Sequence, residues 1–164
     1  VGVHTVGGIS QRMAPGTLMV PDKVIDLNWG RAQSYWDSGD DEPLHVDFTE
    51  PYDSDLRSRL LSAANNGNID IVDGGTYLAT QGPRLETAAE IRHFARMEAD
   101  VVGMTGMPEA VLARELGIPF AAIGVVVNWA AGLAGSSLDF IEIEQQQKAC
   151  IEQVARVIWL LTDA

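Results

Sequence analysis

Cysteine is almost absent from this sequence, because Cys150 is the only one among 164 residues. A single thiol cannot close an internal disulfide, and a chain without disulfides suits a reducing compartment. Long apolar runs are missing too. No stretch approaches the roughly 20 consecutive apolar residues that a membrane span needs, and the opening VGVHTVGG has no cationic signal-peptide start. The sequence therefore predicts a cytoplasmic protein with no membrane association.

Basic residues are also few, since 11 Lys and Arg face 23 Asp and Glu and the formal net charge is −12. A nucleic-acid backbone is bound by clustered basic side chains, so we expect no nucleic-acid partner. The densest acidic run, residues 37–42, is interpreted as a solvated loop, because adjacent carboxylates in a turn do not converge on one metal ion. The three histidines are scattered, and His93 is expected to be packed or at the surface. The sequence therefore predicts no metal site.

The apolar residues make up 46% of the chain and alternate between strand-like and helix-like blocks. This pattern predicts one α/β domain over residues 1–164, with a mixed, largely parallel central sheet flanked by helices. The expected strands are residues 1–6, 17–27, 69–80, 101–104 and 120–127. The expected helices are residues 53–66, 108–117 and 138–161, together with one helix that opens after Pro83. Residues 28–51 form a long polar loop, which we expect to be functional or mobile.

Four polar segments follow expected strands, where open α/β sheets bind their ligands. They are HTVGG at residues 4–8, GPRLET at 82–87, GMTGMPE at 103–109 and VVNWAAG at 126–132. The amides of a glycine turn in HTVGG favour an anion, although a tight turn that requires small residues explains the glycines equally well. Met104 and Thr105 precede an expected helix, so the Thr hydroxyl is either an anion ligand or a helix cap.

The remaining two segments each contain a polar side chain suited to a heterocyclic ligand. Asn128 ends an apolar strand, and its amide can both donate to and accept from the edge of a heterocycle. Glu86 lies near the start of a helix, where the helix dipole favours a carboxylate; contact with a ligand is the alternative.

Residues 75–132, GTYLATQGPRLETAAEIRHFARMEADVVGMTGMPEAVLARELGIPFAAIGVVVNWAAG, resemble the trimeric purine nucleoside phosphorylase and methylthioadenosine phosphorylase family. That family shows a GTY, GP, ET and AE pattern, then GADxVGMSTVPE, and then a strand that ends in Asn or Asp. Upstream, VGGIS, PGTLMVPDKVID and HVDFTEP are similar as well, so the resemblance covers nearly the whole chain.

The resemblance implies a nucleoside phosphorylase fold and a pentosyltransferase of purine salvage, with inorganic phosphate as co-substrate and no other cofactor. It implies that Asn128 binds ring nitrogen 7 and the six-substituent of the purine and stabilises the leaving base. Glu86 matches the base-reading glutamate of the family, and a carboxylate accepts from the ring nitrogen 1 hydrogen of a 6-oxopurine. Relatives that prefer adenine carry Asp at the position of Asn128. Leu85 stands where relatives place an aromatic residue against the base.

For the phosphate and the sugar, the resemblance implies that the backbone at Thr5 and the hydroxyl of Thr105 bind phosphate and that Met104 packs on the ribose. It also implies a homotrimer or a hexamer, in which His45 reaches the site of the adjacent subunit.

The start of the final helix lies over the 5′ end of the sugar in this family. Phosphorylases of ordinary nucleosides place a His there, whereas this sequence has the run LDFI, with Leu138 or Ile141 at the aligned position. An apolar contact suits a 5′-methylthio group, so the expected substrate is S-methyl-5′-thioinosine. Ordinary 6-oxopurine nucleosides and methylthioadenosine are the alternatives.

The family's amino-terminal glycine-rich phosphate loop and its Arg–His pair are absent from these 164 residues, and the first expected strand begins at residue 1. We therefore expect the sequence to be the carboxy-terminal portion of a longer enzyme. A non-catalytic module that kept the purine pocket is the alternative.

Overall fold

The computed structural model describes residues 1–36, 45–133 and 140–162. Within these residues, a seven-stranded sheet has the order β3-β5-β6-β1-β7-β2-β4. The strands are β1 (Gly2–Gly8), β2 (Leu18–Val20), β3 (Lys23–Asp26), β4 (Val72–Asp73), β5 (Thr76–Ala79), β6 (Val101–Gly103) and β7 (Ala122–Trp129). Two pairs, β1 with β6 and β2 with β7, are antiparallel, and the other pairs are parallel. The predicted mixed, largely parallel sheet is confirmed.

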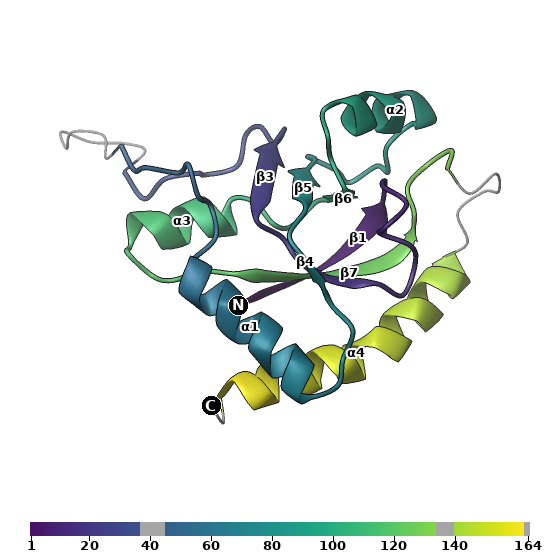
Figure 1. Ribbon diagram of the computed structural model, residues 1–164. Helices are drawn as coiled ribbons and strands as arrows, with labels where there is room; N and C mark the ends of the chain where they lie inside the picture. Colours follow the sequence, from purple (N-terminus) through teal and green to yellow (C-terminus); the bar gives the residue numbers. More distant parts are fainter. Residues whose placement is uncertain (37–44, 134–139, 163–164) are drawn as a thin grey trace.

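Helices cover both faces of the sheet (Figure 1). α1 (Ser54–Asn66) and α4 (Phe140–Thr162) lie together on one side, whereas α2 (Ala88–Arg96) and α3 (Glu109–Glu115) lie on the other. α1 and α4 pack on the sheet through a core that includes Leu60, Ile123 and Val154. Residues 122–127 of β7 are all buried, as expected of a central strand covered on both faces. None of the described helices combines the length and the apolarity needed to cross a bilayer.

The helix boundaries follow from capping residues. Asp53 caps α1 by accepting a hydrogen bond from the amide of Leu56 at 2.7 Å, and the helix ends at Gly67. Thr87 and Glu90 form a capping box at the start of α2, in which each side chain accepts from the other's backbone amide. All four expected helices are confirmed, with shifts of a few residues at their ends.

Two predicted strands are each divided in two. Residues 17–27 break at Pro21, so that β3 lies at one edge of the sheet and β2 lies near the other. Residues 69–80 break at Gly74 and Gly75, whose φ angles of 80° and 126° favour glycine. Residues typical of strands lie on both sides of each break, and the pattern therefore predicted continuous strands.

The predicted glycine turn at Gly7 and Gly8 is wrong, because both residues lie inside β1. Close packing requires Gly8, since a Cβ atom there would lie 1.8 Å from the carbonyl oxygen of Met13. Gly7 pairs with Val102 of β6 and with Asn128 of β7. The two glycines allow close strand packing and do not form an anion-binding turn.

β1 and β7 pair along most of their length, with one irregularity. Val6 pairs with Val126, but Gly7 pairs with Asn128, so Val127 has no partner on β1. A bulge of this kind sets two consecutive residues of one strand against one of its partner and re-aims the side chains beside it. It places Asn128 directly beside Gly7.

Candidate active site

A cavity of about 290 Å³ lies where β1, β6 and β7 meet the loop before α2 and the start of α4. Six of its lining residues are ones that the sequence singled out, namely Thr5, Leu85, Glu86, Met104, Thr105 and Asn128. Six more lining residues lie within the four polar segments but were not singled out individually, namely Val6, Gly7, Gly103, Val127, Ala130 and Ala131, whereas Val102 and Ile143 lie outside those segments. The missed residues are small or apolar, so no polar signature distinguished them from ordinary core residues.

Glu86 is held in place by Thr80, whose hydroxyl donates to Oε1 at 2.7 Å. Its other carboxylate oxygen accepts no hydrogen bond from the described residues, so it remains able to accept one from a ligand. Glu86 directly precedes the N-cap Thr87, so it lies just outside α2, and the acidic residue in the first turn of that helix is Glu90.

Asn128 is half-buried and is anchored by its own backbone neighbour. Its Nδ2 atom donates to the carbonyl oxygen of Trp129 at 2.7 Å. One N–H group and the amide oxygen remain for a ligand, so the side chain offers a donor and an acceptor together. Val127 and Asn128 both line the cavity, although consecutive side chains of a regular strand point to opposite faces. The irregular pairing with β1 accounts for this arrangement.

The turn after β6 is organised by Tyr77. The phenol oxygen of Tyr77 accepts hydrogen bonds from the backbone amides of Thr105 at 3.3 Å and Gly106 at 3.0 Å. Burial raises the pKa of Tyr77, so its hydroxyl stays neutral. The alternative that Thr105 caps a helix is wrong, because the N-cap of α3 is Pro108. The Thr105 side chain therefore lies in the cavity wall.

His4 lies directly behind Thr105. Its ring is 3% exposed, and Nδ1 lies 3.1 Å from the Thr105 hydroxyl oxygen. Nε2 is buried without a hydrogen-bond partner among the described residues, and the Glu109 carboxylate lies 3.7 Å from it. Burial lowers the pKa of His4, and the nearby Glu109 opposes that shift. Sequence reasoning placed His4 in the expected strand 1–6 and missed this contact.

Two loops that line the cavity touch each other at Gly82 and Met104. A Cβ atom on Gly82 would lie 2.5 Å from the Met104 sulfur, and the φ angle of Gly82 is 61°. Only glycine fits here without displacing Met104 or straining the backbone. The loop that carries Glu86 and the turn that carries Thr105 are thus in direct van der Waals contact.

The residues predicted to contact the 5′ end of the sugar are placed as follows. Leu138 lies outside the described residues, and Ile141 is 66% exposed. From the same helix, the half-buried Ile143 lines the cavity. His45 is exposed and does not line the cavity of its own chain, so its predicted role in an adjacent site stays a prediction.

No Lys or Arg is among the described residues that line this cavity. Across the described residues, no group of three His, Cys, Asp or Glu side chains could hold a metal ion; the acidic run 37–42 lies outside them. The wall instead offers a carboxylate from Glu86, an amide from Asn128 and the hydroxyls of Thr5 and Thr105. These groups suit an uncharged polar heterocycle with a hydroxyl-bearing or anionic neighbour.

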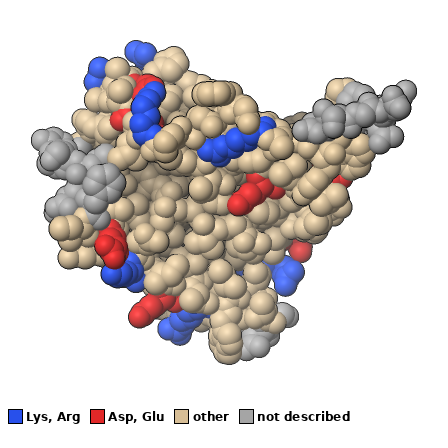
Figure 2. Space-filling view, turned by 180° about the vertical axis from the view of Figure 1, so that it is seen from behind, with Lys and Arg blue, Asp and Glu red and all other residues tan. Residues whose placement is uncertain are grey.

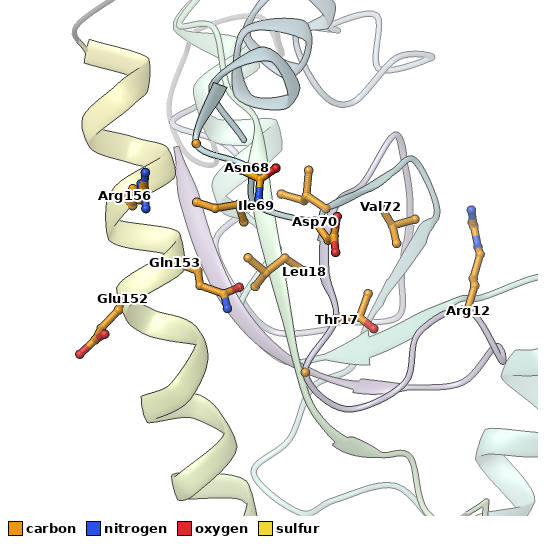
Figure 3. Close-up of a pocket in the computed structure, with 13 residues that line it drawn as sticks. Arg12, Thr17, Leu18, Asn68, Ile69, Asp70, Val72, Glu152, Gln153 and Arg156 are labelled. Carbon is orange, nitrogen blue, oxygen red and sulfur yellow. The ribbon is translucent and has the colours of Figure 1, made fainter. Parts of the chain in front are cut away.

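A larger hollow of about 880 Å³ lies elsewhere, between α4 and the segment that leads into β4 (Figure 3). Arg156 and Arg12 lie at opposite sides of it in that view, with Asp70 between them. The Arg12 guanidinium is occupied by Asp100, to which it donates two hydrogen bonds of 2.8 and 3.0 Å. None of the residues that the sequence singled out lines this hollow, so its size does not make it the functional site.

The α/β fold places this smaller cavity beside the ends of its central strands, where such sheets commonly bind small ligands. A family model, the Phosphorylase superfamily, matches residues 3–162, and the chain belongs to that family.

Individual relatives narrow this further. The chain is 51% identical over 132 residues to a probable S-methyl-5′-thioinosine phosphorylase of Xylella fastidiosa. The match covers 80% of this chain and 56% of that relative. It is 39% identical to the 6-oxopurine nucleoside phosphorylase of Pyrococcus furiosus, over 96% of this chain and 62% of the relative. The chain thus spans less than two thirds of the length of either relative.

Among solved structures, methylthioadenosine phosphorylase from Schistosoma mansoni in complex with tubercidin matches with a TM-score of 0.90 at 25% identity. The match covers 97% of this chain and 62% of that protein. The nucleoside phosphorylase fold expected from the resemblance is confirmed.

Proposed function

We propose that the full-length protein catalyses the phosphorolysis of a purine nucleoside. The observation that carries this proposal is the cavity in which Glu86, Asn128, Met104 and Thr105 meet, in a chain of the Phosphorylase superfamily. A phosphate oxygen bonds to the anomeric carbon while the bond from that carbon to the purine breaks. The electron pair of the broken bond leaves with the purine. Catalysis then depends on positioning the two reactants and on stabilising the charge that develops on the base.

The base is a 6-oxopurine in this proposal. The Thr80 hydroxyl occupies one oxygen of Glu86, and the other oxygen accepts from the ring nitrogen 1 hydrogen that hypoxanthine and guanine carry. Adenine has a lone pair at that nitrogen, which a carboxylate would repel. Asn128, fixed by its bond to the Trp129 carbonyl, directs its remaining donor and acceptor to ring nitrogen 7 and the six-substituent. A site of such polar groups discriminates strongly, because the wrong base leaves one of them unpaired.

The sugar carries a 5′-methylthio group in this proposal, so the substrate is S-methyl-5′-thioinosine. Support comes from the relatives named for that substrate and from the aliphatic side chain of Ile143 in the cavity wall. Ile141 and Leu138 remain candidates for the same contact. Burying the methyl group would contribute on the order of 1 kcal/mol, about a five-fold preference.

The phosphate lies against Thr5 and Thr105, with Met104 packed on the ribose between phosphate and base. Because the described cavity wall contains no Lys or Arg, we propose that residues of the full-length protein outside these 164 supply the basic groups. The relatives are long enough to contain such a segment. No cofactor beyond inorganic phosphate is required.

We further propose a trimer or a multiple of one. Several aromatic side chains on the segment after β3 are exposed, namely Trp29 (73%), Tyr35 (56%) and Trp36 (37%). Large exposed aromatic residues are typical of subunit interfaces. This segment leads through residues 37–44 toward His45, which would reach the neighbouring site.

A cytoplasmic enzyme of purine salvage suits the single, buried thiol of Cys150. A nucleic-acid partner is not part of the proposal. Seen from behind, the surface carries acidic and basic side chains interspersed among broad areas with neither (Figure 2).

The decisive experiment measures phosphate-dependent release of free base from inosine, S-methyl-5′-thioinosine and methylthioadenosine, with the 164-residue chain and with the full-length protein. We expect the full-length protein to have the highest kcat/KM with S-methyl-5′-thioinosine. A preference for inosine would contradict the 5′ assignment, and a preference for methylthioadenosine would contradict the assigned roles of Glu86 and Asn128. Purine binding without any phosphate-dependent release would favour the non-catalytic module.

A further inference from the structure

Arg31 lies on the segment after β3, outside the cavity, and its guanidinium group is directed entirely at backbone. Nη1 donates to the carbonyl oxygens of Met104 at 2.6 Å and Met107 at 2.9 Å, and Nη2 donates to that of Gln81 at 2.8 Å. The side chain is half-buried, and it forms no ion pair with any described carboxylate. The planar guanidinium group of Arg31, whose fixed donors suit several acceptors at once, therefore contacts three backbone carbonyl groups.

The three carbonyl groups belong to the two loops that form the cavity wall. Gln81 follows β5 and precedes the loop that carries Glu86, whereas Met104 and Met107 follow β6. Met104 itself lines the cavity. The strands that support these loops stay paired only up to the amide of Thr80, which donates to the Gly103 carbonyl. Beyond that point, Arg31 connects the two loops by hydrogen bonds.

We propose that Arg31 is a positioning residue that fixes the distance between the base-binding and phosphate-binding halves of the site. This inference rests on the proposed function. Glu86 lies on one of the two loops and Thr105 on the other, so a change in their separation displaces the base relative to the phosphate. Misplacement of reactants by about 1 Å can reduce the rate by about 100-fold. Arg31 touches neither reactant and acts only through the loops.

Neighbouring contacts from the same segment support this assignment. The backbone amide of Trp29 donates to the Gln81 side-chain oxygen at 3.2 Å, and Asn28 Nδ2 donates to the Met107 carbonyl at 3.4 Å. Both contacts are longer than the Arg31 bonds and uncharged. Loss of Arg31 would therefore leave the loops held mainly by these weaker contacts and by van der Waals packing.

The test compares Arg31→Ala and Arg31→Lys with a matched control, Arg57→Ala, in the full-length protein. Arg57 also donates to two backbone carbonyl groups, those of Val20 and Pro21, and pairs with Asp73, but it does not line the cavity. We measure kcat/KM for the nucleoside, the melting temperature, and hydrogen exchange of the two loops. Added guanidinium ion is the rescue reagent, because it can occupy the place of the missing Arg31 guanidinium group.

Arg31→Ala should lower kcat/KM at least tenfold, and millimolar guanidinium should restore part of the loss. Arg31→Lys should fold and remain impaired, because an ammonium group cannot bridge three carbonyls in one plane. Arg57→Ala should keep kcat/KM within about two-fold of the wild-type value, even if its melting temperature falls as much as that of Arg31→Ala.

Near-normal kcat/KM in Arg31→Lys, or equal losses without rescue in Arg31→Ala and Arg57→Ala, would overturn the proposal. Hydrogen exchange separates this failure from failure of the proposed function. If the wild-type protein releases no base, the positioning role of Arg31 still predicts faster hydrogen exchange over residues 81–86 and 103–107 in Arg31→Ala alone. Unchanged exchange in these two segments would refute the positioning role of Arg31 itself.

Discussion

Replacing Glu86 by Gln tests base recognition most directly, because the two side chains have the same shape. The Thr80 hydroxyl can still donate to Oε1, as it does at 2.7 Å in the native protein. The free carboxylate oxygen, however, is exchanged for an amide group that donates. The substituted side chain would therefore present a donor to the nitrogen 1 hydrogen of a 6-oxopurine, which is also a donor.

The magnitude follows from the loss of one hydrogen bond to a charged group, worth about 1.5–3 kcal/mol. That energy corresponds to a decrease of about 10- to 150-fold in kcat/KM for the 6-oxopurine nucleoside. The 6-aminopurine analogue should lose less or gain, because its ring nitrogen 1 can accept from the Gln amide. Glu86→Ala should impair the 6-oxopurine nucleoside severely as well. In Glu86→Ala the Thr80 hydroxyl can still donate to the Gly103 carbonyl oxygen, which lies 3.4 Å away in the native protein. The loop at residues 81–86 should therefore fold normally.

The assay is phosphate-dependent base release from the 6-oxo and 6-amino forms of one nucleoside, with full-length protein. Glu98→Gln is the matched control, since this exposed carboxylate lies beyond the far end of α2. The ratio of kcat/KM for the two nucleosides should change in Glu86→Gln and stay constant in the control. An unchanged ratio with near-normal rates would refute the assignment of Glu86.

Three further predictions concern the surrounding structure. Burial lowers the pKa of His4 below its ordinary value of 6.5, so the folded state binds fewer protons than the unfolded state; stability is fully present above about pH 6.5 and is lost as pH falls toward the lowered pKa. Denaturation of His4→Asn between pH 7 and 5 should show a flatter dependence than the wild type, and parallel curves would contradict this. Tyr77→Phe removes the acceptor for the Thr105 amide and should raise the KM for phosphate more than that for nucleoside; equal changes would indicate a general loss of structure. Leu60→Ala, at a fully buried position, should lower the free energy of unfolding by about 2–5 kcal/mol, whereas Leu116→Ala, half exposed, should change it by about 0.5 kcal/mol or less.

Local chemistry explains which elements could be predicted from the sequence. The helix at residues 54–66 has an Asp cap, leucines at helical spacing and a terminal glycine, and all three act within a few residues of one another. Residues 122–127 of the strand at 122–129 form an uninterrupted run without charged or polar side chains, and all of them are buried. Signals of this kind do not depend on distant parts of the chain.

Two of the errors arose where distant contacts decide the conformation. Gly7 and Gly8 form a turn signal locally, yet pairing with β6 and β7 and the approach of Met13 keep them inside a strand. Likewise, no local pattern connects His4 with Thr105, which lies 101 residues away. The candidate site residues were found because the family resemblance supplied such long-range information. Arg31, which binds only backbone carbonyl groups, left no trace in side-chain patterns.

The unpaired Val127 has a consequence for how this pocket can change over evolution or in the laboratory. Deleting that residue would restore an even ladder between β1 and β7 in which Asn128 still pairs with Gly7, so the amide of Asn128 would keep its side of the sheet. Substitutions at position 128 likewise occur where the ladder is already interrupted and therefore disturb the pairing little. This part of β7 thus tolerates both a change of residue and the loss of one, because the pairing with Gly7, and not the count of residues before it, places the Asn128 side chain.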